Sequence, residues 1–177
     1  MPFQAWVARV NSPGQGAGAA YASSTSATDV SPAPQYMSQT YGPMYVGQAW
    51  RLTAYAIASN TATPTLNVGF YYGGVAGTAM ITSGAITTTT AMSSWWWEWY
   101  AYAEVISLGS SGSIRCYGWV KIPTSATAVT TQQMSATSQD VTINTTTNSA
   151  LTAGATWGSS SSSNTLTLKG YIVEQLN

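Results

Sequence analysis

The chain has 177 residues, of which only 6% are charged, with five basic residues, five acidic residues and no histidine. An ordinary soluble domain carries about 25% charged residues, so we expect a surface that is partly covered by neighbours in an assembly. Scattered basic residues argue against nucleic-acid binding, which needs clustered Lys and Arg. There is also no stretch of about 20 apolar residues that would cross a membrane.

The N-terminal quarter of the chain differs in composition from the rest. Residues 3–10 (FQAWVARV) are typical of a short strand, whereas residues 11–48 are rich in Gly, Ser and Ala and hold most of the prolines. Such a stretch forms neither a helix nor a central strand. We therefore expect an N-terminal strand and an extended arm or long loop over residues 1–48, with contacts to a partner as its use, followed by a β-domain over 49–177.

From Trp50 onward the sequence alternates between strand-length runs and turn-forming segments. The predicted strands are 50–59, 65–73, 79–84, 95–106, 113–122, 128–136, 140–145, 150–157 and 164–176. No window has a sustained helical period. Short strands at this spacing predict an all-β fold, either an antiparallel β-sandwich or a barrel.

Two of these runs alternate cleanly between apolar and other residues, namely 65–72 and 114–122. This period of two indicates strands that are buried on one face only. In the run 95–106 the two glutamates select the outward face, which is then Trp96, Glu98, Tyr100, Tyr102, Glu104 and Ile106. The inward set is Trp95, Trp97, Trp99, Ala101, Ala103 and Val105.

The charges also predict how 95–106 and 113–122 pair as a hairpin. A single register sets Glu98 opposite Lys121 and Glu104 opposite Arg115, which gives two cross-strand ion pairs. The same register sets Tyr100 opposite Trp119, Tyr102 opposite Tyr117, and Ala103 opposite Cys116. Opposite charges and aromatic pairs across strands each stabilise a sheet by roughly 0.2–1 kcal/mol.

A search for catalytic chemistry finds no supporting pattern. Histidine, the commonest general base and metal ligand, is absent. Glu98 and Glu104 lie roughly 20 Å apart along one strand, whereas glycosidase carboxylates need about 5–9.5 Å. Cys116 falls on the apolar face and is typical of a small buried hydrophobic residue. We predict no catalytic residue, no cofactor and no metal site; a hydrolase that uses Asp or Glu alone is the least favoured alternative.

The outward aromatic residues admit two interpretations. Tyr100, Tyr102, Tyr117 and Trp119, named here the aromatic ladder, form one exposed row in the predicted register. Exposed aromatic patches usually mark protein contacts, where such side chains are enriched. We therefore predict an inter-subunit or capsid interface at the aromatic ladder. The alternative is a sugar-binding platform, because Trp and Tyr faces stack on pyranose rings.

Two long segments carry a family resemblance. WRLTAYAIASNTATPTLNVGFYYGG, from Trp50, and ALTAGATWGSSSSSNTLTLKGYIVEQLN, at the C-terminus, resemble virion structural proteins of tailed bacteriophages, of the jelly-roll minor capsid or head-decoration type. The resemblance covers about the last 125 residues and brings no catalytic residues with it. It implies a β-sandwich of jelly-roll type that forms a homotrimer and contacts the major capsid protein or other virion proteins.

The same resemblance implies a location on the capsid surface after assembly in the host cytoplasm. This agrees with an N-terminus, MPFQAWVARV, that lacks the basic and apolar segments of a secretory signal. The alternative function is a carbohydrate- or receptor-binding β-sandwich, either a phage fibre tip or a carbohydrate-binding module of a secreted enzyme, with a glycan as the partner.

Overall fold

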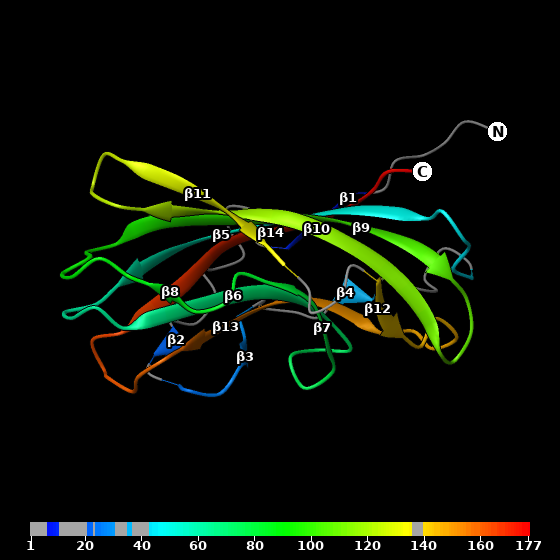
Figure 1. Ribbon diagram of the computed structural model, residues 1–177, viewed down its shortest axis with the longest axis horizontal. Coiled ribbons are helices and arrows are strands. Elements are labelled where there is room, and N and C mark those ends of the chain that lie inside the picture. The colour runs from blue at the N-terminus through cyan, green and yellow to red at the C-terminus, as the bar shows by residue number, and fades with distance from the viewer. Residues whose placement is uncertain (1–6, 11–20, 23, 31–34, 37–42, 136–139) are drawn as a thin grey trace.

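The computed structural model describes residues 7–10, 21–22, 24–30, 35–36, 43–135 and 140–177. These residues form strands and connecting loops without a helix, in two antiparallel sheets that face each other (Figure 1). The prediction of an all-β antiparallel sandwich is confirmed. With no helix among them, the described residues contain no helical segment able to cross a membrane.

The larger sheet has eight strands. These are β1 (Val7–Val10), β2 (Tyr21–Ala22), β5 (Ala49–Ser59), β9 (Trp95–Ser107), β10 (Gly112–Pro123), β11 (Val129–Met134), β12 (Asp140–Ile143) and β14 (Thr165–Gln175). Their order is β1-β14-β5-β9-β10-β11, with β2 beside β14 and β12 beside β10. The long strands β5, β9 and β10 therefore lie in the middle of this sheet.

The smaller sheet has six strands. These are β3 (Thr28–Asp29), β4 (Gln35–Tyr36), β6 (Thr65–Tyr72), β7 (Thr78–Thr82), β8 (Ile86–Thr87) and β13 (Ala150–Trp157). Their order is β3-β13-β6-β7, with β4 beside β13 and β8 beside β6. Two of the crossings between the sheets, β5 to β6 and β13 to β14, lie side by side, since β5 pairs with β14 in one sheet and β6 pairs with β13 in the other. Adjacent crossings of this kind are a feature of jelly-roll sandwiches.

The N-terminal strands are short, as expected for this segment. β1 and β2 pair with β14, and β3 and β4 pair with β13. β1 lies within the predicted strand 3–10 and forms an edge of the larger sheet. Much of the predicted arm falls outside the described residues, so the division of the chain into 1–48 and 49–177 stays a prediction.

Tryptophans packed against alanines fill the middle of the larger sheet. On the face of β5 and β9 that is turned toward the smaller sheet, Trp50 lies opposite Ala103. In the same way Ala54 lies opposite Trp99, and Ala56 lies opposite Trp97. All six side chains are at most 2% exposed. Each large ring thus has a methyl group beside it, which lets the face reach the dense packing of a protein interior.

Aromatic contacts join the two sheets across this core. The ring centroid of Phe70, on β6, lies 6.4 Å from that of Trp99 and 6.0 Å from that of Tyr171 on β14. All three residues are fully buried. The inward residues predicted for β9 are buried as well, except that Trp95 is half-buried and packs against the core from its edge.

One burial prediction is wrong for half of its strand. The alternation over residues 65–72 predicted burial on one face of β6, yet Gly69 and Tyr71 are also buried. Tyr71 lies over Gly154 on the neighbouring strand, where a Cβ atom would come within 2.6 Å of the tyrosine ring. The Tyr71 side chain therefore covers the outer face of the smaller sheet at this place and is itself buried there. The pattern of residue types along one strand does not reveal such burial.

Because each of these tryptophans lies opposite an alanine in a filled core, enlarging one of the alanines should destabilise the fold. We expect Ala56→Leu to lower the free energy of unfolding by about 1–3 kcal/mol, because the added carbons meet Trp97 in a filled core. Ile57→Leu, at the next position on the opposite face, should change it by less than about 0.5 kcal/mol. Urea unfolding measures both; an unchanged midpoint for Ala56→Leu would contradict the packing described here.

Candidate functional site

The candidate site lies on the face of the larger sheet that is turned away from the smaller one. The predicted register of the β9–β10 hairpin is the observed one. Glu98 lies opposite Lys121 and Glu104 opposite Arg115. The aromatic pairs follow from the same register, with Tyr100 opposite Trp119, Tyr102 opposite Tyr117, and Ala103 opposite Cys116 on the inner face.

The aromatic ladder is a set of touching rings. Tyr102 and Tyr117 are stacked with centroids 5.1 Å apart, and Tyr100 and Trp119 are 5.5 Å apart at 30°. Tyr117 also meets Trp119 edge-on at 6.0 Å. Tyr117 is 51% exposed, and the other three are half-buried. Further along β9, Trp96 is 58% exposed and lies 6.2 Å from Tyr55 on β5. Whether the ladder serves as an interface remains a prediction.

Two ion pairs flank the ladder on the β10 side, and one of them differs from the prediction. Lys121 Nζ donates to both carboxylate oxygens of Glu98, at 3.1 and 3.2 Å, as the register suggested. Arg115, in contrast, donates from Nε and Nη2 to the two oxygens of Asp140, at 2.7 and 3.0 Å.

The predicted ion pair between Glu104 and Arg115 is therefore corrected to one between Asp140 and Arg115. The physical reason is that β12 pairs with the other edge of β10 and sets Asp140 beside Arg115. The two hydrogen bonds from Arg115 lower the pKa of the Asp140 carboxyl. The same bonds raise the pKa of Arg115, and a weaker charge interaction with Glu104 also raises it.

A third ion pair, which the sequence analysis did not predict, lies across β5 and β14. Arg51 donates from Nη2 to Glu174 Oε2. The hydrogen bond to Glu174, and after it one to the Tyr102 hydroxyl, raises the pKa of Arg51. The register of β14 with β5 sets Glu174 opposite Arg51, and that of β5 with β9 sets Arg51 opposite Tyr102. This pair joins residues 123 positions apart in the sequence.

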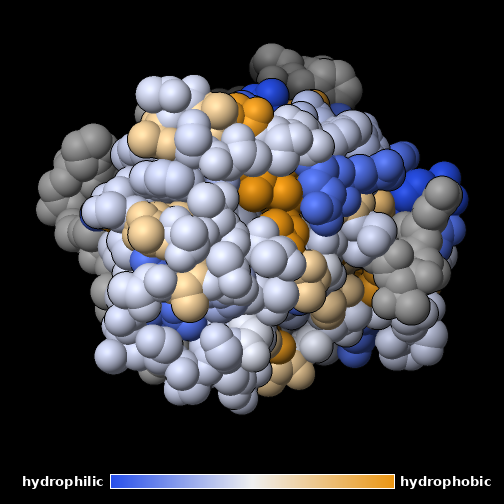
Figure 2. Space-filling view, turned by 60° about the vertical axis from the view of Figure 1, so that its left-hand side comes forward, coloured by the Kyte–Doolittle hydropathy of each residue, from blue (hydrophilic) through white to orange (hydrophobic). Residues whose placement is uncertain are grey.

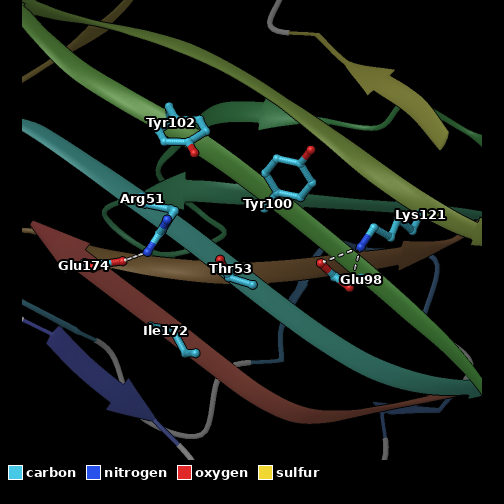
Figure 3. A pocket seen from close by; sticks show the side chains of 8 residues that line it. All are labelled: Arg51, Thr53, Glu98, Tyr100, Tyr102, Lys121, Ile172 and Glu174. Atoms are coloured by element: carbon cyan, nitrogen blue, oxygen red, sulfur yellow. Dashed lines mark hydrogen bonds and ion pairs between the residues drawn. The ribbon is translucent and has the colours of Figure 1, made fainter. Parts of the chain in front are cut away.

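Between these ion pairs the sheet face carries a hollow of about 500 Å³ (Figure 3). It is lined by Arg51, Thr53, Glu98, Tyr100, Tyr102, Lys121, Ile172 and Glu174, and is named here the sheet hollow. Figure 3 shows these side chains on β14, β5, β9 and β10, with the two ion pairs at separate places on its rim. A smaller hollow of about 310 Å³ shares Glu98 and Lys121 with it and extends to Tyr55, Trp96 and Val129.

The ionisable groups of this region are held in place by one another. Both carboxylates that line the sheet hollow, Glu98 and Glu174, are bonded to a cation.

Cys116 lies on the buried face of β10, 6% exposed, and burial raises its pKa to about 12. The prediction that Cys116 is a buried residue is confirmed. Within the described ranges, no three His, Cys, Asp or Glu side chains gather in a way that would hold a metal ion.

Comparisons with known proteins leave the chain without an assigned family. No family model matches it, and no curated protein matches it. Two solved structures are similar to 98% of the chain, "Structure of infectious bursal disease virus Gt strain" at 12% identity and "Crystal structure of infectious bursal disease virus VP2 subviral particle" at 11%. Their TM-scores are 0.25 and 0.22, and the chain spans 42% of the length of each. Such low scores carry no weight for the function of this chain.

The environment of Cys116 predicts how its thiol reacts. We expect iodoacetamide to leave the folded protein unmodified at pH 9.0, the ordinary pKa of a thiol, because burial keeps the group protonated until the pH approaches 12. In urea the same thiol should react completely. Intact-mass spectrometry measures both states, and rapid modification of the folded protein at pH 9.0 would show that Cys116 is accessible and ionised.

Proposed function

We propose that this chain is a non-enzymatic structural domain of a virion, a decoration or minor capsid protein of a tailed bacteriophage that acts through contacts with other subunits. It forms a homotrimer on the capsid surface and contacts the major capsid protein or other virion proteins. The single observation that carries this proposal is the aromatic ladder on an open face of the larger sheet.

Several properties of this face suit a protein contact. Tyr and Trp are enriched at the centres of interfaces, because they bury a large area while losing little conformational freedom. The rings already touch one another, so they form a preformed surface. The neighbouring charges of Lys121 and Arg115 are matched by carboxylates, which lowers the cost of covering them.

The composition of the chain supports the same proposal. Figure 2 shows a side of the molecule where most residues are of intermediate hydropathy, with strongly hydrophilic residues gathered mainly beside a strip of hydrophobic ones. A chain with 6% charged residues and no net charge tends to associate. The phage assignment itself is supported by the resemblance of the two sequence segments described above.

The proposal predicts the mass of the protein in solution. We expect wild type to have three times the 18.6 kDa mass of the chain. The double variant Tyr117→Ser, Trp119→Ser should associate at least about 100-fold more weakly, because an aromatic hot-spot residue contributes about 2 kcal/mol and two such contributions do not add in full. Size-exclusion chromatography with light scattering measures both.

A matched control removes a different exposed apolar side chain. Val46, in the turn before β5, is 60% exposed, and Val46→Ser should leave the trimer intact. A wild-type protein that stays monomeric at every concentration, or a double variant that associates like wild type, would contradict the proposed function.

A further inference from the structure

We infer that the sheet hollow is a binding site for a neutral saccharide. The site extends from the aromatic ladder onto β5 and β14, and it would give the domain a recognition function in addition to the proposed assembly. The two sites share Tyr100 and Tyr102, so a saccharide and a subunit contact over these two rings exclude each other, whereas Tyr117 and Trp119 belong to the ladder alone.

The charges of the sheet hollow select against an ionic ligand. Its lining holds two cations and two carboxylates, combined as Arg51 with Glu174 and Lys121 with Glu98. A charged ligand would have to displace one member of a pair and leave the other unmatched. A neutral ligand can bond to both pairs as they stand. Each saccharide hydroxyl donates one hydrogen bond and accepts others, so it fits a rim that offers ammonium, guanidinium and carboxylate groups together.

The charged groups remain accessible while they are paired. The side chains of Arg51 and Lys121 are each 45% exposed, and that of Glu98 is 40% exposed. Holding these flexible side chains in ion pairs before the ligand arrives reduces the entropy that binding would otherwise cost.

The floor and wall of the sheet hollow supply the apolar surface that a sugar ring needs. Tyr100 and Tyr102 line it, and each already has a neighbour on the β10 side, Trp119 or Tyr117. What they offer to the hollow is the remaining ring surface and the hydroxyl group. Such rings carry a negative face, which attracts the C–H groups of a pyranose.

The lining residues sit at fixed positions on paired strands. Ile172, Thr53 and Tyr100 form one row across β14, β5 and β9. Glu174, Arg51 and Tyr102 form the adjacent row. Sites built on a sheet keep their geometry better than sites on loops, and a volume of about 500 Å³ lies within the usual range for small-ligand sites.

An extended peptide is the other neutral occupant to consider. Peptides that bind β-sheets commonly add a strand to an open edge and use its free backbone groups. The sheet hollow lies over β5 and β9, whose backbones already pair with strands on both sides. Main-chain pairing is therefore closed to a peptide here, which favours the saccharide.

The test is titration of the full chain with neutral oligosaccharides. The probes are cellohexaose, maltohexaose, mannohexaose and the hexamer of N-acetylglucosamine, with a heparin hexasaccharide as the anionic comparison and a Ser/Thr-rich peptide as the peptide comparison. We expect at least one neutral oligosaccharide to shift the amide resonances of β5 and β9 in NMR spectra, and calorimetry to give its Kd.

Three variants localise the binding. Tyr100→Ala removes a wall of the sheet hollow, and Glu174→Gln breaks the Arg51 ion pair; each should weaken binding at least tenfold. Tyr45→Ala, an exposed tyrosine that belongs neither to the ladder nor to the hollow, is the matched control and should leave the Kd within twofold. Circular dichroism confirms that each variant is folded.

The outcomes separate this inference from the proposed assembly. Absence of binding by all four neutral oligosaccharides, preference for the heparin fragment or the peptide, or unchanged Kd values in both hollow variants would overturn it. None of these results bears on whether the protein is a trimer.

Discussion

The packing of tryptophan against alanine between β5 and β9 is the interaction on which the rest of the structure depends. Burying one indole removes about 150–250 Å² from water, which stabilises the fold by about 4–6 kcal/mol at 25 cal/mol per Å². A cross-strand ion pair contributes only roughly 0.2–1 kcal/mol. Shifting β9 by one residue would bring Trp96 into the core and expose Trp97 and Trp99. The core therefore decides the register, and the surface charges agree with it.

The residues on the outer face of the larger sheet follow from this register of β9. Because side chains alternate along a strand, fixing Trp97 and Trp99 inside places Glu98, Tyr100 and Tyr102 outside. β10 then adds Tyr117 and Trp119 beside them, and β5 adds Arg51 and Thr53. One constraint in the core thus produces both the aromatic ladder and the sheet hollow, which lie on strands held on both sides by hydrogen-bonded neighbours.

Local patterns in the sequence predicted the parts of this face that lie within one hairpin. The register of β9 with β10 was predictable because two charge pairs and two aromatic pairs agree on one alignment over a short loop. The partners of Arg115 and Arg51 were not predictable. Asp140 and Glu174 reach them through pairings of β12 with β10 and of β14 with β5, and these depend on how distant strands come together.

In the smaller sheet, too, local patterns predicted the strand but not all of its contacts. Period-two alternation identified β6 as a strand and its inner residues as core. It did not predict that Tyr71 is buried as well, because that burial depends on Gly154 of β13, a residue more than 80 positions away, leaving space for the ring. The residues of one segment show that it forms a strand, whereas burial of the strand's outer face depends on the strands beside it.

The separation of the two faces of β9 is tested most directly by ¹⁹F NMR of protein labelled with 5-fluorotryptophan. Trp96 and Trp97 are adjacent in sequence but are 58% and 0% exposed. Exchanging H₂O for D₂O should shift the Trp96 resonance and leave those of Trp97 and Trp99 unchanged. A solvent shift for Trp97 as large as that for Trp96 would contradict the account, because the strand would then present its other face to the core.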